Sequence, residues 1–263
     1  MTGPAFAEER HQQTAGEERR QPAPAPRRAP VVAPRRAPVV APRRAPVVAP
    51  RRAPVVAARR PPVALVDYGV GNLHSAAKAL DRAGADVRLV STVEAAAGTA
   101  ALVVPGVGAY GACLAGLGRA GGAEAVAAWI KGGQPVLGIC VGMQLLFEGS
   151  EEGPVRDGIG AVAGTVRRLP STVKVPHIGW NGVRVRPGSR LLAGLPEGAR
   201  FYFVHSYAAE AGDPAVAATC DYGMPFAAAV ERDNLFGTQF HPEKSGSNGL
   251  ALLASFVDEA RRA

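Results

Sequence analysis

The sequence predicts an α/β fold in which an open mixed sheet is covered by helices on both faces. A short apolar run at 62–67, a loop at 68–72 and a helix-like segment at 75–83 follow one another as strand, loop and helix. Further apolar runs alternate with alanine-rich stretches as far as about residue 150, which is typical of a parallel sheet. Beyond about Glu151, Gly and Pro interrupt a series of short strands, so mixed or antiparallel pairing is expected there.

The first half of this α/β region gives the following expected elements. Strands are predicted at 62–67, 86–90, 101–104 and 134–139, and helices at 75–83, 123–131 and 143–148. The strands are apolar throughout, which indicates that the sheet is buried on both faces.

The second half is expected to consist of strands that end in one helix. The predicted strands are 160–169, 182–186, 200–204, 216–219, 226–231 and 235–239. The helix is predicted at 248–262, where Leu250, Leu253, Ala254 and Val257 recur at helical spacing and form one apolar face. A single domain over 61–263 accommodates all these elements.

Residues 1–60 differ in composition from the rest of the chain. The octamer A-P-R-R-A-P-V-V occurs four times in tandem over 25–56. Proline at every fourth position removes backbone donors and fixes φ, so a disordered, extended tail is expected. Its paired arginines could neutralise phosphates of nucleic acid or anionic lipid. A non-essential tail, from an expanded coding repeat or a start codon assigned too far upstream, is the interpretation we favour.

The charge distribution argues against a nucleic-acid partner for the domain. The formal net charge of the chain is +8, but residues 1–60 hold 13 Arg and 4 Glu, net +9, and leave the remainder at −1. No stretch reaches the roughly 18 uninterrupted apolar residues of a membrane span, and the N-terminus lacks the apolar core of a secretory signal. A cytoplasmic protein without membrane contact is therefore expected.

One of the three cysteines lies in a setting typical of a nucleophile. Cys113, Cys140 and Cys220 are odd in number and lack CxxC spacing, which disfavours a disulfide framework and a structural zinc site. Cys140 lies in the motif G-I-C-V-G at 138–142, between a buried strand and a predicted helix. Small residues on both sides of a tight strand-to-helix turn are typical of a nucleophile elbow. For Cys113 and Cys220 a buried structural role is preferred.

A base and its orienting partner follow the last predicted strand. In G-T-Q-F-H-P-E-K at 237–244, His241 and Glu243 are two residues apart, so in extended geometry both would point to the same side. A thiol nucleophile needs a base, and the base needs an orienting group. Together with Cys140 they form a candidate Cys-His-Glu triad, whereas His11 and His74 receive no functional assignment.

These motifs resemble those of the class I, triad-type glutamine amidotransferases. The resemblance rests on G-I-C-V-G-M-Q and G-T-Q-F-H-P-E-K-S, and it implies a flavodoxin-like open sheet and a cysteine that attacks the glutamine side-chain amide. V-D-Y-G-V-G-N-L, P-H-I-G-W-N and Y-F-V-H-S-Y further resemble the subfamily of glutaminase subunits of imidazole glycerol phosphate synthase. The resemblance covers about 62–262, and the tail has no counterpart in it.

The resemblance implies roles for further residues. The stretch P-G-V-G at 105–108 would be an oxyanion strand that reorients, so that the Gly108 region and the Val141 amide would bind the oxyanion. Gly106, Gln144 and Glu152 would bind the substrate glutamine. Val141 stands where leucine is usual in the family, which preserves an apolar side chain and the backbone amide. The stretch 111–122 is richer in Gly and Ala than expected for the helix that follows the oxyanion strand, so low local stability is expected there.

The resemblance also implies a partner, a (β/α)8 barrel cyclase subunit that receives ammonia within a heterodimer. The residues expected against this partner are His177, Trp180, Asn181 and Lys244. His177 and Trp180, on a loop bounded by Pro and Gly, could equally be packing residues. His205 and Tyr207 are expected to line either the pocket or the interface.

The implied function is glutamine hydrolysis that supplies ammonia for imidazole glycerol phosphate and AICAR formation in histidine biosynthesis. No metal or organic cofactor is expected, because G-V-G-N-L at 69–73 is too short to indicate a dinucleotide site. One alternative is a glutaminase subunit of another ammonia-channelling synthase, such as one that serves anthranilate or pyridoxal phosphate synthesis. A second is a non-catalytic scaffold whose arginine-rich tail is the functional part.

Overall fold

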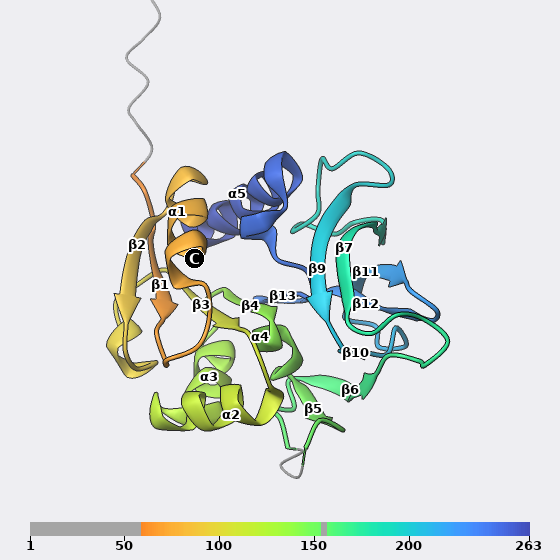
Figure 1. Cartoon of the computed structure of the whole chain (residues 1–263). Coiled ribbons are helices and arrows are strands. Elements are labelled where there is room, and N and C mark those ends of the chain that lie inside the picture. The colour runs from red at the N-terminus through yellow and green to blue at the C-terminus, as the bar shows by residue number, and fades with distance from the viewer. Residues whose placement is uncertain (1–58, 154–156) are drawn as a thin grey trace, which may run out of the picture. The chain divides into compact units, whose positions relative to one another are not determined.

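An eight-stranded mixed sheet forms the centre of the computed structural model, which describes residues 59–153 and 157–263 (Figure 1). The predicted disordered tail, apart from its last two residues, lies outside the described residues. The strand order is β2-β1-β3-β4-β13-β12-β11-β8. The other named strands form two smaller sheets, one of three strands in the order β10-β6-β5 and one of two strands, β7-β9. The predicted α/β fold with an open mixed sheet is confirmed.

The elements alternate as expected up to β4. The strands are β1 Pro62–Val66, β2 Asp86–Val90, β3 Ala101–Gly106, β4 Val136–Cys140, β5 Phe147–Ser150, β6 Val162–Arg168, β7 His177–Gly182, β8 Arg184–Val185, β9 Arg200–His205, β10 Tyr207–Ala209, β11 Val216–Asp221, β12 Pro225–Arg232 and β13 Leu235–Thr238. The helices are α1 Leu73–Arg82, α2 Tyr110–Arg119, α3 Gly122–Lys131, α4 Val141–Gln144 and α5 Gly246–Arg262, with short 3-10 helices η1 Glu94–Ala96 and η2 Pro242–Lys244.

The pairing changes from parallel to antiparallel at β13. Strands β2, β1, β3, β4 and β13 run parallel, whereas β12, β11 and β8 add antiparallel. β1, β3 and β4 are buried along almost their whole length, as expected for strands covered on both faces. β2 is an exception, since it is the edge strand and its Leu89 is 59% exposed.

Helices cover both faces of the parallel half. α1 and α5 contact each other on one face, and α2 and α3 contact each other on the other (Figure 1). The buried face of α5 consists in part of other residues than the predicted apolar face. Leu253 and Val257 are buried as predicted, but Leu252 and Phe256 complete the buried stripe and Leu250 is only partly buried.

The predicted helix at 143–148 is wrong beyond Gln144. α4 ends at Gln144, and β5 begins at Phe147. The carbonyls that a continuing helix would use are taken by another segment, because Leu145 O accepts from the Ile159 amide and Leu146 O accepts from the Val162 amide. Long-range pairing with residues 158–162 therefore replaces the helix.

The P-H-I-G-W-N motif was interpreted as a loop, and this too is wrong. Its last five residues, together with Gly182, form β7, which pairs antiparallel with β9, so that His177 lies opposite His205. Ile178 and Trp180 on β7 are 60% and 49% exposed. The predicted strand at 182–186 is reduced to β8, because Gly182 already ends β7.

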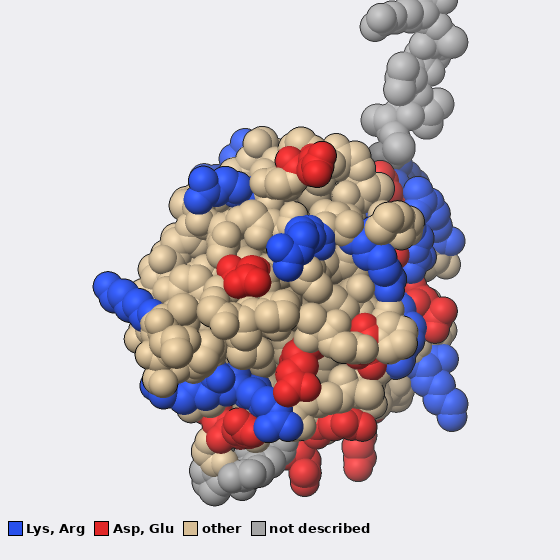
Figure 2. Space-filling view, turned by 90° about the vertical axis from the view of Figure 1, so that its right-hand side faces the viewer, with Lys and Arg blue, Asp and Glu red and all other residues tan. Residues whose placement is uncertain are grey.

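The surface around the antiparallel strands carries few charges. Figure 2 shows the molecule from the side on which β7, β11 and β12 lie, and acidic and basic side chains are scattered there among broad uncharged areas. Along the two described stretches, no helix combines the length and hydrophobicity that a membrane crossing requires.

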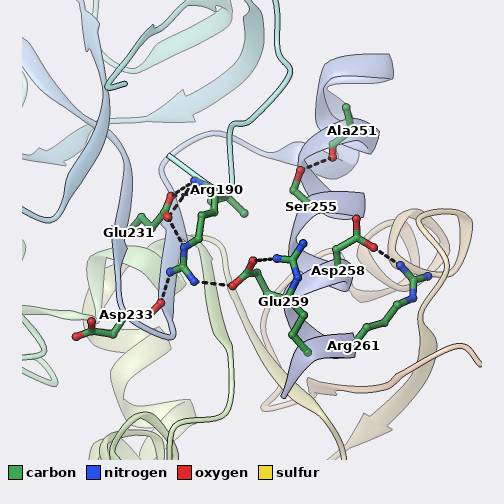
Figure 3. Close-up of polar contacts among 10 residues, drawn as sticks. Arg190, Glu231, Asp233, Ala251, Ser255, Asp258, Glu259 and Arg261 are labelled. Carbon is green, nitrogen blue, oxygen red and sulfur yellow. Dashed lines mark hydrogen bonds and ion pairs between the residues drawn. The ribbon is translucent and has the colours of Figure 1, made fainter. Parts of the chain in front are cut away.

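A network of ion pairs ties α5 to the sheet (Figure 3). Nε of Arg190 lies 2.9 Å from Oε1 of Glu231, and its Nη1 lies 2.6 Å from Oε2 of Glu259 on α5. Burial raises the pKa of Glu231, but hydrogen bonds from the Arg190 and Leu191 amides and from the Ser189 hydroxyl outweigh this effect and lower the pKa overall. Glu231 is therefore a buried carboxylate held in its charged form.

Candidate active site

Cys140 lies on a strained turn at the end of β4. Its backbone has φ 55° and ψ −112°, and it is one of two described non-glycine residues with positive φ. Such a conformation costs energy and persists only where the surroundings impose it. The side chain is buried, with 3% exposure. This geometry agrees with the expected nucleophile elbow.

The glycines on either side of Cys140 are required by close packing of the backbone. A Cβ on Gly142 would lie 1.9 Å from the Val104 carbonyl oxygen, and one on Gly138 would lie 2.7 Å from the Gly142 oxygen. A Cβ on Gly106 would lie 2.5 Å from the Gly142 amide nitrogen. The elbow can therefore form only where no side chain separates it from β3.

Val141 begins α4, so its amide is one of the first-turn amides that have no intrahelical acceptor. It is therefore available to an oxyanion next to Cys140. α4 has only four residues, so the helix dipole that it directs toward Cys140 is smaller than that of a longer helix.

His241 reaches the same sheet edge through β13. β13 pairs parallel with β4, with Thr238 opposite Ile139. His241 Nδ1 lies 2.8 Å from Oε1 of Glu243, and both side chains are buried. The expected extended geometry is wrong, because Glu243 lies in the 3-10 turn η2 rather than in a strand. The turn brings the carboxylate to the imidazole.

His241 is held in its protonated form. Burial alone lowers its pKa, but interactions with Cys140 and Glu243 outweigh this effect and raise the pKa to about 9. Nε2 of His241 is buried and has no hydrogen-bond partner within the described part of the chain. Since Nδ1 is engaged by Glu243, Nε2 is the atom left to exchange a proton with a substrate.

Most of the predicted site residues line one cleft of about 640 Å³. The predicted residues among its walls are Gly108, Cys140, Val141, Gln144, Glu152, His205, Tyr207, His241 and Lys244. Gly106 is not among them, since it lies at the end of β3 against the elbow. Glu243 is not a wall residue either, because it lies behind His241.

The two predicted glutamine-binding side chains in this cleft are fixed by hydrogen bonds. Nε2 of Gln144 donates to the Tyr207 carbonyl at 2.9 Å. Oε2 of Glu152 accepts from the Tyr110 amide at 3.1 Å. The neighbouring Glu151 is engaged elsewhere, in an ion pair with Arg167. Among the adjacent acidic residues, Glu152 is thus the one that faces the cleft.

The predicted interface residues are divided between surface and interior. Trp180 and Lys244 are exposed, and Asn181 donates to the Asp221 carbonyl at 3.1 Å. His177 is buried and stacks on Tyr222 at a centroid distance of 4.0 Å. For His177, the structure supports the packing interpretation.

Gln239 was missed as a candidate site residue. It is fully buried, and its Nε2 lies 3.7 Å from the Cys140 sulfur. The signal was present in the motif G-T-Q-F-H-P-E-K-S, of which only the histidine, the glutamate and the lysine were assigned. Cys113 is buried as expected, and its thiol donates to the Val107 carbonyl at 3.2 Å. Burial is the main reason that its pKa is raised to about 11.

Comparisons with known proteins agree with this geometry. Residues 64–260 match the family described as "Glutamine amidotransferase class-I". The chain is 50% identical over 204 residues to the imidazole glycerol phosphate synthase subunit HisH of Nocardia farcinica, covering 74% of this chain and 96% of that protein. It is 51% identical over 198 residues to the subunit HisH of Mycobacterium tuberculosis, with the same coverage.

Solved structures resemble the fold at low sequence identity. A structure described as a glutamine amidotransferase matches with a TM-score of 0.60 at 20% identity, covering 75% of this chain and 98% of that one. The structure of PurLQS from Thermotoga maritima matches with a TM-score of 0.60 at 21% identity, covering 76% and 98%.

Proposed function

Because the chain belongs to the class-I glutamine amidotransferase family, we propose that Cys140, His241 and Glu243 hydrolyse glutamine to glutamate and ammonia. The chain is the glutaminase subunit of an imidazole glycerol phosphate synthase and works in histidine biosynthesis. The observation that carries the catalytic proposal is the meeting of two parallel strand ends. β4 presents Cys140 and β13 leads to His241 in one cleft.

The first half of the reaction forms a thioester. The sulfur of Cys140, whose proton resides on His241, attacks the side-chain amide carbon of glutamine, and the carbonyl oxygen becomes an oxyanion. The Val141 amide and the Gly108 region stabilise this charge. Protonated His241, with its pKa of about 9, gives a proton from Nε2 to the departing nitrogen. The carbon–nitrogen bond breaks, and ammonia leaves.

The second half returns the enzyme to its starting state. Neutral His241 takes a proton from water, and the resulting hydroxide attacks the thioester carbon. The carbon–sulfur bond breaks, glutamate leaves, and the sulfur again lies beside a protonated imidazole. Glu243 holds Nδ1 throughout, so that Nε2 faces the reacting atoms. Gln144 and Glu152 hold the substrate, the latter through its α-amino group.

The ammonia passes to a cyclase subunit, a (β/α)8 barrel in a heterodimer with this chain, which forms imidazole glycerol phosphate and AICAR. The surface for this partner is the exposed side of β7, where Ile178 and Trp180 present apolar area next to the cleft residue Lys244. Nζ of Lys244 lies 5.8 Å from the ring centroid of Tyr202, which also contacts the Trp180 ring.

The proposal is tested by measuring glutamine hydrolysis with and without the cyclase subunit and its ribulosyl formimino nucleotide substrate. A low rate alone and a steep rise with partner and nucleotide are expected. Trp180→Ala should reduce this rise more than it reduces the rate measured alone. Equal rates in both conditions would leave the glutaminase chemistry standing and assign another partner. Undiminished hydrolysis by Cys140→Ala would overturn the catalytic proposal.

A further inference from the structure

A continuous series of buried hydrogen bonds leads to the sulfur of Cys140 through Gln239. We propose that Gln239 is a further catalytic residue, which donates an N–H hydrogen bond to the Cys140 sulfur and stabilises its negative charge. This inference rests on the proposed function, because it assumes that Cys140 is the nucleophile. It adds a neutral donor to a site in which His241 is the charged one.

The position of Gln239 gives it direct access to the reacting atom. The residue follows β13, its side chain is fully buried, and Nε2 lies 3.7 Å from Sγ of Cys140. Sulfur is larger than oxygen, so a hydrogen bond to it is longer than one to a carbonyl. The Gln239 amide nitrogen also donates to the Ala228 carbonyl at 2.9 Å, so its backbone is held by β12.

The orientation of the Gln239 amide follows from its neighbour. Nε2 of Gln144 lies 2.9 Å from the Tyr207 carbonyl oxygen, which can only accept, so the amino group of Gln144 must face it. The same nitrogen lies 3.0 Å from Oε1 of Gln239. Gln239 therefore presents its oxygen to Gln144 and its amino group to the sulfur.

Two histidines extend this series behind Tyr207. Nδ1 of His205 lies 2.9 Å from the same carbonyl, so Nδ1 carries the hydrogen. Nε2 of His205 then accepts from Nδ1 of His177, at 3.0 Å. Burial lowers the pKa of His177 to about 4, and burial, with the nearby His177 and His241, lowers that of His205 to about 3. Both stay neutral at neutral pH, so each bond keeps one direction.

A donor at this position serves both halves of the reaction. It stabilises the sulfur as an anion before attack, and again when the thioester breaks and sulfur is the leaving group. The other titratable groups near Cys140 are of two kinds. His241 is a cation, whereas Tyr68 and Cys113 are buried groups whose pKa values are raised mainly by burial, so they remain neutral. Gln239 neither gains nor loses a proton in this range.

The test compares wild type with Gln239→Met, which is unbranched and of similar length but lacks the donor, and with Gln239→Glu. The readouts are kcat and KM for glutamine and the pH profile of Cys140 alkylation by iodoacetamide. For Gln239→Met, kcat should fall about tenfold or more with a smaller change in KM, and the alkylation midpoint should move up by about one pH unit. Gln239→Glu should move the midpoint further, because a carboxylate oxygen would face the sulfur.

Thr238→Val is the matched control. Thr238 is fully buried at the end of β13, next to Gln239 in the chain, and its hydroxyl donates to the Phe240 carbonyl at 3.0 Å. It should lower the melting temperature and leave the alkylation profile unchanged. A wild-type profile and kcat in both Gln239 variants would overturn the inference, and an inactive Cys140→Ala enzyme in the same assay would show that the proposed function still holds.

Discussion

His241 and Glu243 are joined by a contact of 2.8 Å between Nδ1 and Oε1, made across one 3-10 turn after β13 has ended. Only Pro242 separates the two residues. A hydrogen bond also stabilises this turn, because Oγ of Ser245 donates to the His241 carbonyl at 2.6 Å. The pair is thus preorganised by local backbone geometry, and a short segment supplies both the proposed base and the carboxylate that orients it.

Two substitutions of Cys140 distinguish its catalytic role from the backbone strain at this position. Cys140→Ala and Cys140→Gly should each reduce glutamine hydrolysis by at least about a thousandfold, because no nucleophile remains. The φ of 55° is unfavourable for alanine but accessible to glycine. Cys140→Gly should therefore unfold with a free energy about 1 kcal/mol higher than Cys140→Ala. Urea unfolding measures the difference, and equal values would mean that the elbow stores no such strain.

Alanine substitution of two glycines should have opposite effects on stability. Gly142→Ala would place its Cβ 1.9 Å from the Val104 carbonyl oxygen, so it should cost about 3 kcal/mol or more and abolish activity. Gly118→Ala is its control on α2, where an added Cβ meets nothing within 4 Å. It should stabilise the protein by about 0.5–1 kcal/mol and leave activity intact. Thermal melts would contradict this account if Gly142→Ala were tolerated as well as Gly118→Ala.

The buried histidines should make stability fall in acid. The unfolded chain binds a proton at each histidine below about pH 6.5, whereas His177 and His205 stay neutral in the folded state down to pKa values of about 4 and 3. The unfolded state binds more protons in this window, so the free energy of unfolding decreases as pH falls. Each histidine contributes a slope of up to about 1.4 kcal/mol per pH unit.

His177→Phe provides the measurement. Phenylalanine can keep the stacking with Tyr222 but removes one titrating group. The slope of unfolding free energy between about pH 4 and 6.5 should be shallower by about 1.4 kcal/mol per pH unit than in wild type. Parallel slopes for the two proteins would show that His177 is protonated in the folded state.

Loss of Arg190 should destabilise the fold. Arg190→Leu leaves Glu231 buried, at 7% exposure, without its cationic partner, and should lower the unfolding free energy by about 3 kcal/mol. Arg88→Leu is the matched control, because its pair with Asp86 is exposed and 3.5 Å long, and should change stability by less than about 1 kcal/mol. Denaturant titration of both variants distinguishes the two cases, and similar small losses would contradict a buried network.

The strand pattern and the elbow could be predicted from sequence because both depend on local signals. Fully buried parallel strands such as β3 and β4 are short apolar runs, and the glycines around Cys140 mark a tight turn. β7 was not predicted, because its motif is bounded by Pro and Gly and its alternating apolar residues, Ile178 and Trp180, lie on the exposed face. The length of α4 depends on acceptors taken by residues 158–162, which are remote from the motif.

The candidate triad was predictable by type, whereas its supporting contacts were not. The role of Gln239 depends on the orientation of Gln144, which in turn depends on a carbonyl of β10. Such a series of contacts joins segments that only the folded sheet brings together. The apolar face of α5 was predicted only in part, because the helix rotates to pack Leu252 and Phe256 against the sheet.

The place of β13 between β4 and β12 also determines when activity can arise during synthesis. His241 follows Cys140 by 101 residues, so the ribosome releases the proposed nucleophile long before its proposed base. Until β13 is made, β4 has an unpaired edge, and the parallel and antiparallel strands are not yet joined. A nascent or truncated chain that stops before His241 therefore carries the thiol without the other two residues of the proposed triad. Hydrolysis by this triad requires that translation has passed Glu243.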